Sequence, residues 1–366
     1  IEMNRDEKSP FYQKFSEVEE NRLKPAFLDY KNEIGNHALK NGIKVNYIKN
    51  NINPTFNLYY ILDMGTKHDA KMALAVKYLP YLGTDKYSAE QLQKEFYRLG
   101  LSFDIYTASE RIYVSLSGLE ESFTEGLTLF EHILKNAKPD ETALKGLIDD
   151  AFKKRDDAKK DKNTIFWRAL YSYGAYGEKS EFRDKLSEKE LKSITADELV
   201  SKIKELLQYQ HSIFYYGQND AKDVVKTLTK HHKTPRKLKP YPKPPVYTEQ
   251  ETKKDKVIFV NYDMVQAKIM MLSKDQAFNP EVMPEARVFG EYFGSGLSSI
   301  VFQEIREARA LAYSAFAGYR TPSQADKSHF VQGFMSVQAD KMKDAIIAMR
   351  ESVSYTHLRA HETSEN

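Results

Sequence analysis

The stretch ALAVKYLPYLGT, residues 73–84, is the most informative part of this 366-residue sequence. Its apolar residues recur at helical spacing, and the pattern extends over about 69–82 and closes at Gly83. Two strands are predicted before this helix, at 42–50 and 56–65, joined by an Asn/Pro turn. Strands followed by a helix are typical of the start of an α+β domain.

The sequence after this stretch continues the same mixture of helices and strands. Ser88 begins a second helix by forming a capping box with Gln91, and Gly100 ends that helix. Further elements are predicted along the chain: a β-hairpin from LSFDIYTA and RIYVSLSGL, helices at roughly 122–137 and 140–162, a strand at 211–217 and a helix up to His232. We interpret the charged run KKRDDAKKDK, 153–162, as a solvated helix face.

A linker divides the chain. Residues 233–255 contain five prolines and many lysines, which predicts an extended, semi-rigid segment. Beyond it the order restarts with KVIFVNY and QAKIMMLSK as strands, then helices, then strands. We interpret the two units as an internal duplication in an α+β fold, each a mostly antiparallel sheet with helices on one face. The predicted organisation is a linker or extension at 1–30, a first domain at 31–232, the linker at 233–255, a truncated second domain at 256–353 and an atypical tail at 354–366.

Composition excludes several classes of function. The net charge is only +3, with both signs interspersed, so no nucleic-acid partner is predicted. No apolar run approaches the ~20 residues of a membrane span. The absence of cysteine excludes disulfides, thiolate metal sites and cysteine nucleophiles. The N-terminus lacks the hydrophobic region of an export signal, and it lacks an initiating Met, so we expect a chain that begins inside something longer.

Two local motifs do not support the chemistry that they suggest. Gly294-Ser-Gly296 follows helical sequence and is not followed by Lys-Ser/Thr, so a tight turn with close backbone packing is favoured over a nucleotide loop. The nine histidines form no His-Glu-x-x-His motif. His357 and His361 have helical spacing but lie in the terminal residues, where chains fray. His231 and His232 stand beside the linker and are predicted to be exposed and inert.

The segment from Met64 to Gly100 resembles the insulinase/pitrilysin family of zinc peptidases, the inverzincins. The catalytic helix of that family carries His-x-x-Glu-His, and in this chain Leu74, Lys77 and Tyr78 occupy the three positions. A hydrocarbon, a cation and a phenol are poor zinc ligands, and Asp149 or Asp150 on the later helix cannot restore the set. The resemblance therefore implies a peptidase fold without a metal site. It also implies that zinc belongs to a catalytic partner half.

A second motif resembles the same family. Residues 302–314, FQEIREARALAYS, place Arg306 and Tyr313 seven residues apart, as in the family pattern Phe-x-x-Leu-Arg-x-x-x-x-Leu-Gly-Tyr. The resemblance implies that this pair orients the scissile carbonyl of a peptide held at the partner's zinc. The alternative is that Arg306 pairs with a nearby Glu while Tyr313 is part of the core. We interpret Arg309 as a helix-surface charge.

Together these patterns lead to one functional hypothesis and its alternatives. We expect the non-catalytic half of a two-half zinc metallopeptidase, inactive alone, that binds peptide in a closed chamber beside a catalytic half on the same original chain or on another subunit. The first alternative is a non-enzymatic scaffold or assembly subunit, and a third is a peptide-binding module acting alone. The compartment stays open: the habit of the family favours the periplasm, and a cytoplasmic protein is compatible with the sequence. If the last sheet lacks strands, we expect an exposed edge.

Overall fold

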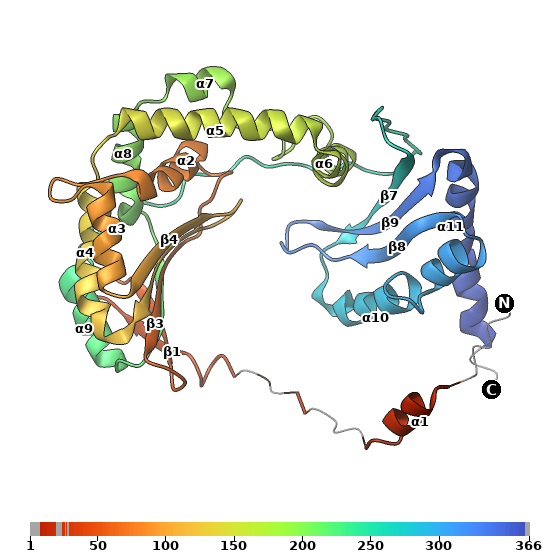
Figure 1. The fold of residues 1–366 in the computed structure, drawn as a ribbon, viewed down its shortest axis with the longest axis horizontal. Helices are drawn as coiled ribbons and strands as arrows, with labels where there is room; N and C mark the ends of the chain where they lie inside the picture. The colour runs from red at the N-terminus through yellow and green to blue at the C-terminus, as the bar shows by residue number, and fades with distance from the viewer. Residues whose placement is uncertain (1–7, 20–23, 26, 28, 363–366) are drawn as a thin grey trace.

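Two α+β bodies face each other across a bridge of helices. The computed structural model describes residues 8–19, 24, 25, 27 and 29–362, with side chains as far as residue 352. Figure 1 shows the first body on the left and the second on the right, joined along the top by α5 (Glu141–Lys160) and α6 (Tyr171–Tyr176). The predicted α+β fold with two sheets is therefore confirmed. The short helix α1 (Pro10–Ser16) lies apart from both bodies and buries none of its residues.

The first sheet has six strands in the order β1-β2-β6-β3-β5-β4. Every neighbouring pair is antiparallel except β2 and β6, so the sheet is mostly antiparallel as predicted. The Asn/Pro turn between β2 and β3 makes no hairpin, because β6 lies between these two strands. The strands are β1 (Gly35–Ala38), β2 (Lys44–Lys49), β3 (Thr55–Leu62), β4 (Leu101–Thr107), β5 (Ile112–Leu119) and β6 (Ser212–Gly217).

The core of the first domain lies between this sheet and its helices. Strand β3 alternates strictly, and Phe56, Leu58, Tyr60 and Leu62 on one face are fully buried. Each such side chain contributes roughly 1.5–3 kcal/mol by leaving water. Figure 1 shows helices on the outer side of the sheet, while its other face is turned toward the second domain. The helices of this domain are α2 (Ala70–Tyr78), α3 (Ala89–Arg98), α4 (Phe123–Asn136), α7 (Glu188–Ser193), α8 (Ala196–Glu205) and α9 (Ala221–His231).

Side-chain caps fix where the first helices begin. The carboxylate of Asp69 accepts a hydrogen bond from the backbone N–H of Met72 at 2.8 Å and so begins α2. Ser88 and Gln91 form the predicted capping box at the start of α3. These local rules are readable in sequence, and the helices lie where the sequence places them.

The second sheet has three antiparallel strands in the order β7-β9-β8. Its helices pack on one face, around a separate core that contains Val301, Ile305, Met335 and Val337. The two sheets thus have separate cores, and the predicted division into domains stays a prediction. The elements are β7 (Gln266–Ala277), α10 (Met283–Phe293), the π-helix η6 (Phe302–Ala308), β8 (Ala312–Arg320), β9 (Ser328–Gln338) and α11 (Met342–Glu362).

The predicted strand KVIFVNY, 256–262, is wrong. These residues form no strand, and Val257 and Phe259 are 92% and 80% exposed. In the first domain the corresponding strand β2 pairs with β6, whereas no strand in the described part of the chain occupies that place beside β7. An alternating apolar segment without a ladder partner has no backbone hydrogen bonds to hold it as a strand. Strand β7 therefore forms one edge of its sheet.

The predicted linker is attached along its length. The hydroxyl of Tyr241 donates to the carbonyl of Gln210 at 2.5 Å and accepts from the N–H of Asp63 at 3.0 Å. Further on, Gln250 donates its N–H to the carbonyl of Ala175 at 2.7 Å. The segment therefore lines the molecule and does not act as a free tether. At the other end, the backbone of α11 continues into the predicted tail as far as Glu362, while the side chains of His357 and His361 lie outside the described ones.

Aromatic stacking holds the bridge against the second sheet. Trp167, in the π-helix η3 (Thr164–Leu170), lies 4.7 Å from the ring of Phe334 and stacks on Phe316 at 6.0 Å. Phe316 and Phe334 are directly opposite each other in the β8–β9 ladder. Their strand neighbours point into the helix-packed core, so these two rings lie on the other face of the sheet. This junction connects the two domains.

A buried polar network lies beneath the first sheet and corrects the prediction for His232. His232 is only 4% exposed, and its Nδ1 lies 2.6 Å from the carboxylate of Glu131. The same carboxylate accepts from the hydroxyl of Tyr60 at 2.7 Å, and the Nε2 atoms of His232 and His211 are 2.8 Å apart. In sequence His232 lies beside the linker, but at the C-terminal end of α9 its side chain points into the core. Burial, and then His232, lower the pKa of His211 to about 4.

The single tryptophan allows a test of the junction. We expect Phe334→Ala, or the milder Phe334→Leu, to shift the emission of Trp167 to longer wavelength, because water then reaches the indole. Far-UV circular dichroism should be unchanged. Val331→Ala, an exposed position on the same strand, is the matched control and should leave the emission unaltered. Identical spectra for Phe334→Ala and wild type would show that the rings do not meet.

The buried network predicts a pH dependence of stability. His211 titrates near pH 6.5 when unfolded and at about 4 when folded, so from pH 6.5 downward the unfolded chain takes up a proton that the folded chain does not. The free energy of unfolding should therefore fall between pH 6.5 and 4, by up to about 3 kcal/mol from this group. We expect urea-unfolding series to show a shallower slope for His211→Gln. The control His37→Gln, on exposed β1, should keep the wild-type slope; parallel curves for wild type and His211→Gln would contradict the assignment.

Candidate functional site

Helix α2 carries the positions where the resembled family holds its metal. Leu74 and Lys77 line a cavity, whereas Tyr78 is fully buried. The hydroxyl of Tyr78 donates to the carbonyl of Asp140 at 2.5 Å and accepts from the N–H of the same residue at 2.8 Å. Burial raises the pKa of Tyr78, so the phenol stays neutral. A hydrocarbon, an ammonium group and a bonded phenol do not fit a zinc ion.

The rest of the described chain offers no substitute set of ligands. No group of three or more His, Asp or Glu side chains within it is arranged to hold a metal ion. Asp150, on the helix where the third family ligand would fall, forms an ion pair with Lys154 at 2.6 Å. Nothing in the described helices is long and apolar enough to cross a bilayer.

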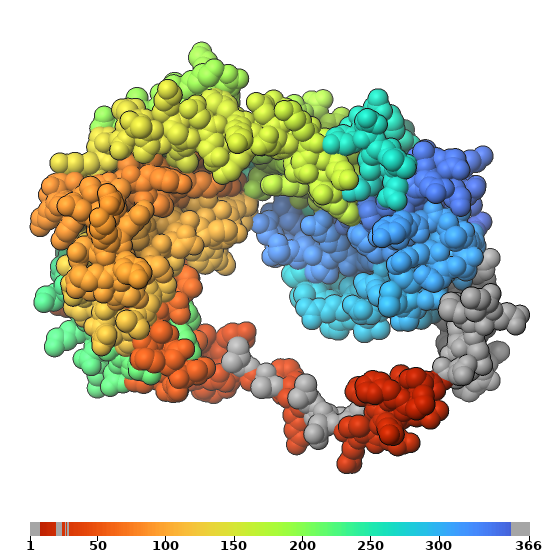
Figure 2. Space-filling view, in the orientation of Figure 1, coloured from red at the N-terminus to blue at the C-terminus, as the bar shows by residue number. Residues whose placement is uncertain are grey.

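The cavity beside α2 has a volume of about 920 Å³. Its walls come from α2, from the bridge α5–η3–α6, from the loop at 181–186, from the linker and from the loop between β8 and β9. Figure 2 shows the hollow between the two bodies, closed along the top by the bridge. The site therefore exists only because the two domains and the bridge are held together.

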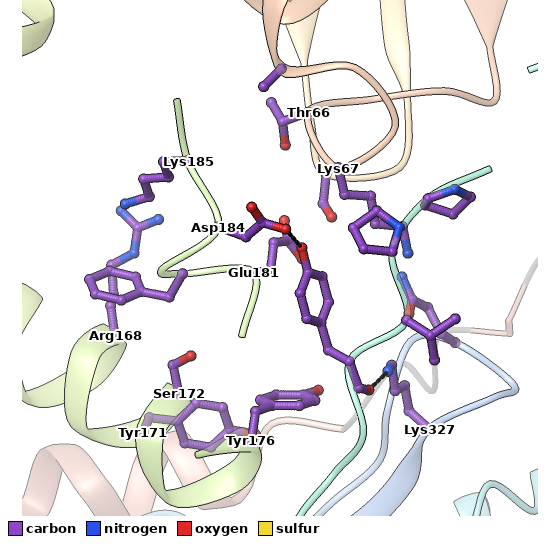
Figure 3. A pocket seen from close by; sticks show the side chains of 18 of the residues that line it. Thr66, Lys67, Arg168, Tyr171, Ser172, Tyr176, Glu181, Asp184, Lys185 and Lys327 are labelled. Carbon is purple, nitrogen blue, oxygen red and sulfur yellow. Dashed lines mark hydrogen bonds between the residues drawn. The ribbon is translucent and has the colours of Figure 1, made fainter. Parts of the chain in front are cut away.

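Charged and aromatic side chains line this cavity. Asp184 accepts a hydrogen bond from the hydroxyl of Tyr247 at 2.6 Å, and Glu249 accepts from the N–H of Ser328 at 3.0 Å. Burial, followed by Glu249, raises the pKa of Tyr176 to about 12. Figure 3 shows the rings of Tyr171 and Tyr176 side by side at one end, with Arg168 and Lys185 together along one wall.

Arg306 and Tyr313 lie elsewhere, on the second domain, and neither lines the cavity. Tyr313 is 74% exposed, which excludes the alternative that it is part of the core. The guanidinium of Arg306 lies 4.7 Å from the ring of Phe302 and 5.9 Å from the ring of Tyr313. Its nearest carboxylate contact is a loose one with Glu307 at 3.8 Å. The two side chains are adjacent and both reach solvent.

The backbone between these residues departs from regular geometry twice. A β-bulge in β8 leaves Tyr313 without a partner between Ala312, which faces Val337, and Ser314, which faces Ser336; Ala312 is in the helix-packed core, whereas Tyr313 is exposed. Ala310 has a φ of 49°, a left-handed conformation that costs an alanine roughly 1–2 kcal/mol. Such features cluster where a side chain must be aimed.

Arg309 is a different kind of residue from Arg306. Its guanidinium lies 3.0 Å from the carboxylate of Glu351 and 4.0 Å from that of Glu304. It therefore ties η6 to α11, while the sequence predicts only a surface charge.

The glycine turn behaves as predicted. Gly294 follows α10, and a Cβ at this position would collide with the carbonyl oxygen of Ala317 in β8. The glycine permits close packing of helix and strand, and no phosphate-binding loop is formed.

Arg155, Arg168 and Lys185 escape the sequence analysis. Arg155 lies inside the run interpreted as a solvated face, yet it is half-buried and donates to the carbonyl of Leu186 at 2.6 Å. A signal exists: Leu144, Ile148 and Ala151 precede it at helical spacing, so Arg155 extends an apolar stripe of α5.

Comparisons with known proteins find zinc peptidases and their inactive domains. Residues 193–359 match the family described as "Peptidase M16 inactive domain". Over 298 residues the chain is 22% identical to the uncharacterized zinc protease YmxG of Bacillus subtilis, covering 78% of this chain and 69% of that protein.

Solved structures share the fold. A peptidase M16 inactive domain from Pseudomonas fluorescens superposes with a TM-score of 0.66 at 15% identity, over 88% of this chain and 78% of that one. The periplasmic protease PqqL from Escherichia coli superposes with a TM-score of 0.73 at 15% identity, over 88% of this chain but only 36% of its own length. The fold, the matched domain and the missing ligands agree: residues 193–359 match the M16 inactive domain, and the whole chain has the fold of the insulinase/pitrilysin (M16) zinc peptidases without their His-x-x-Glu-His motif.

Proposed function

We propose that this chain is the non-catalytic half of a two-half zinc metallopeptidase. It binds peptide between its domains, and Arg306 and Tyr313 orient the scissile carbonyl for a zinc site on the catalytic half. The observation that carries this proposal is the exposed Arg306–Tyr313 pair, which lies beside a β-bulge and a left-handed alanine.

The chemistry of the pair suits a carbonyl that becomes tetrahedral. Such a carbonyl develops negative charge on oxygen, and donors fixed in advance lower the barrier because they need no reorganisation. Arg306 offers a permanently charged fork and Tyr313 a neutral O–H donor. Contact with the rings of Phe302 and Tyr313 restricts the guanidinium before substrate arrives.

The first sheet offers a surface that suits an extended peptide. Strand β4 forms one edge, where a peptide can add by main-chain hydrogen bonds regardless of its sequence. The face away from the helices carries partly exposed aromatic side chains, which accept apolar residues: Tyr59, Tyr106, Tyr113 and Phe214.

A scaffold role is the second candidate. It is favoured by the position of Arg306 and Tyr313, because neither lines the cavity in the isolated chain. In that case the peptidase-like fold serves assembly, and the pair has no catalytic consequence.

The kinetic test separates these candidates. With a matching catalytic half supplied, we expect Arg306→Ala and Tyr313→Phe each to lower kcat for a fluorogenic peptide by about 10²-fold, with a smaller change in KM, because the donors act on the transition state.

Arg309→Ala is the matched control, since it removes a neighbouring guanidinium that is held by Glu351 and Glu304. It should leave kcat near the wild-type value. Wild-type turnover by Arg306→Ala and Tyr313→Phe would favour the scaffold.

The metal content of the isolated chain is a separate test. We expect elemental analysis after dialysis to find far less than one zinc per chain, and no cleavage of a fluorogenic peptide, because Leu74, Lys77 and Tyr78 supply no ligand set. Stoichiometric zinc or cleavage that chelators abolish would overturn the assignment as the non-catalytic half.

A further inference from the structure

The cavity beside α2 contains cations that form no ion pair. Its lining holds seven basic and four acidic side chains, an excess of three positive charges: Lys67, Lys77, Arg155, Arg168, Lys185, Arg320 and Lys327 against Glu181, Asp184, Glu249 and Asp326. Lys67 forms an ion pair with Glu110. Among the described residues the other six form none, and four of these lie on α2, α5, η3 and the loop at 181–186: Lys77, Arg155, Arg168 and Lys185.

Arg168 and Lys185 form the centre of this charge. The Nζ of Lys185 lies 4.3 Å from the ring centre of Phe182, and the guanidinium of Arg168 lies 5.9 Å from the same ring. One aromatic ring thus holds two cations, and Figure 3 shows them on one wall of the cavity. Burial, then Arg168 and Arg155, lower the pKa of Lys185, and no carboxylate offsets them. Uncompensated charges that repel one another favour an incoming anion.

The remaining two cations come from other elements. Lys77 lies on α2, at the position of the Glu in the His-x-x-Glu-His motif of the resembled family, and Arg155 lies on α5 with one nitrogen bound to the carbonyl of Leu186. The four cations therefore surround the cavity from three helical elements and a loop. Because the four cations lie on four different segments, they suit a ligand that carries several carboxylates along a chain.

The other wall of the cavity suits a peptide more than a phosphate. Trp167, Tyr171 and Tyr176 provide aromatic surface for apolar side chains. No glycine-rich loop is present in the lining, and Lys77 lies in the last turn of α2, not at a helix N-terminus where phosphates bind. A volume of about 920 Å³ admits several amino-acid residues.

We propose that this cavity binds acidic peptide segments, with Arg168 and Lys185 as the principal contacts to aspartate or glutamate carboxylates and Lys77 and Arg155 as further ones. The inference rests on the proposed peptide-binding function and adds to it a preferred substrate class. In this account α2, the helix that carries the zinc-binding motif in the catalytic halves of the resembled family, forms part of a surface that binds carboxylates.

Trp167 lines the cavity and is the only tryptophan, so its fluorescence reports binding directly. We would titrate the intact chain with a short peptide of alternating Ala and Glu, and with the isosteric peptide in which Gln replaces Glu. The acidic peptide should bind at least about tenfold more tightly, since each charge-assisted hydrogen bond is worth about that factor. Its affinity should fall as salt is added.

Variants identify the site. The double variant Arg168→Gln/Lys185→Gln should weaken the acidic peptide by about tenfold or more and leave the Gln peptide unchanged. The matched control Lys222→Gln/Lys226→Gln removes the same charge from exposed positions on α9 and should change neither affinity. Inorganic phosphate at equal ionic strength should not displace the acidic peptide.

The outcomes are distinguishable from failure of the proposed function. Equal affinity for the Glu and Gln peptides would overturn the acidic preference but not peptide binding. The same would follow if the control variant lost as much affinity for the acidic peptide as Arg168→Gln/Lys185→Gln. Displacement by low concentrations of phosphate would replace the inference with a phosphate site. Absence of binding by the acidic peptide also overturns it, whereas the kinetic effect of Arg306 on the reconstituted peptidase is measured independently.

Discussion

The contact of Trp167 with Phe316 and Phe334 is the interaction on which the arrangement depends. Domains joined by a chain are expected to move relative to each other unless an apolar interface holds them. Here the π-helix η3 lays Phe166 and Trp167 on the aromatic face of the second sheet, and such pairs contribute roughly 0.5–1.5 kcal/mol each beyond their buried area. Because the cavity is built from both domains, its shape and its charge follow from this junction.

The fold does not require the metal of its relatives. Asp69 still begins α2, and Met72, Ala75 and Val76 still fill the core. Tyr78 bonds to Asp140, the residue that begins α5, so a phenol ties together the two helices that by resemblance would share an ion. This hydrogen bond connects α2 to α5 without a metal ion between them. In our proposal, the chemistry that needs the ion comes from the catalytic half, and this chain binds and orients the peptide.

Local rules account for most of what the sequence predicted correctly. The caps at Asp69 and Ser88 and the alternation in β3 are set by neighbours a few residues away. Errors arose where distant partners decide. Residues 256–262 alternate like a strand but have no neighbouring strand in the described sheet. His232 is buried because its ring hydrogen-bonds to the carboxylate of Glu131, which is far away in sequence.

The site was predictable only in part. The family motif indicated Arg306 and Tyr313, and the structure places them close together. Their role stays a prediction, because a catalytic contact depends on a partner. The cavity cations were missed, since Arg155, Arg168 and Lys185 are gathered by tertiary folding from separate segments and the run that holds Arg155 looks like a solvated surface.

The central claim is that this half completes a peptidase by presenting two donors to a substrate. The most direct test is an experimental structure of the chain with its catalytic half and a peptide that is not cleaved. Our account predicts the guanidinium of Arg306 and the hydroxyl of Tyr313 within about 3 Å of the carbonyl oxygen at the scissile bond. A peptide bound at the catalytic half with both donors turned away from it would contradict the account.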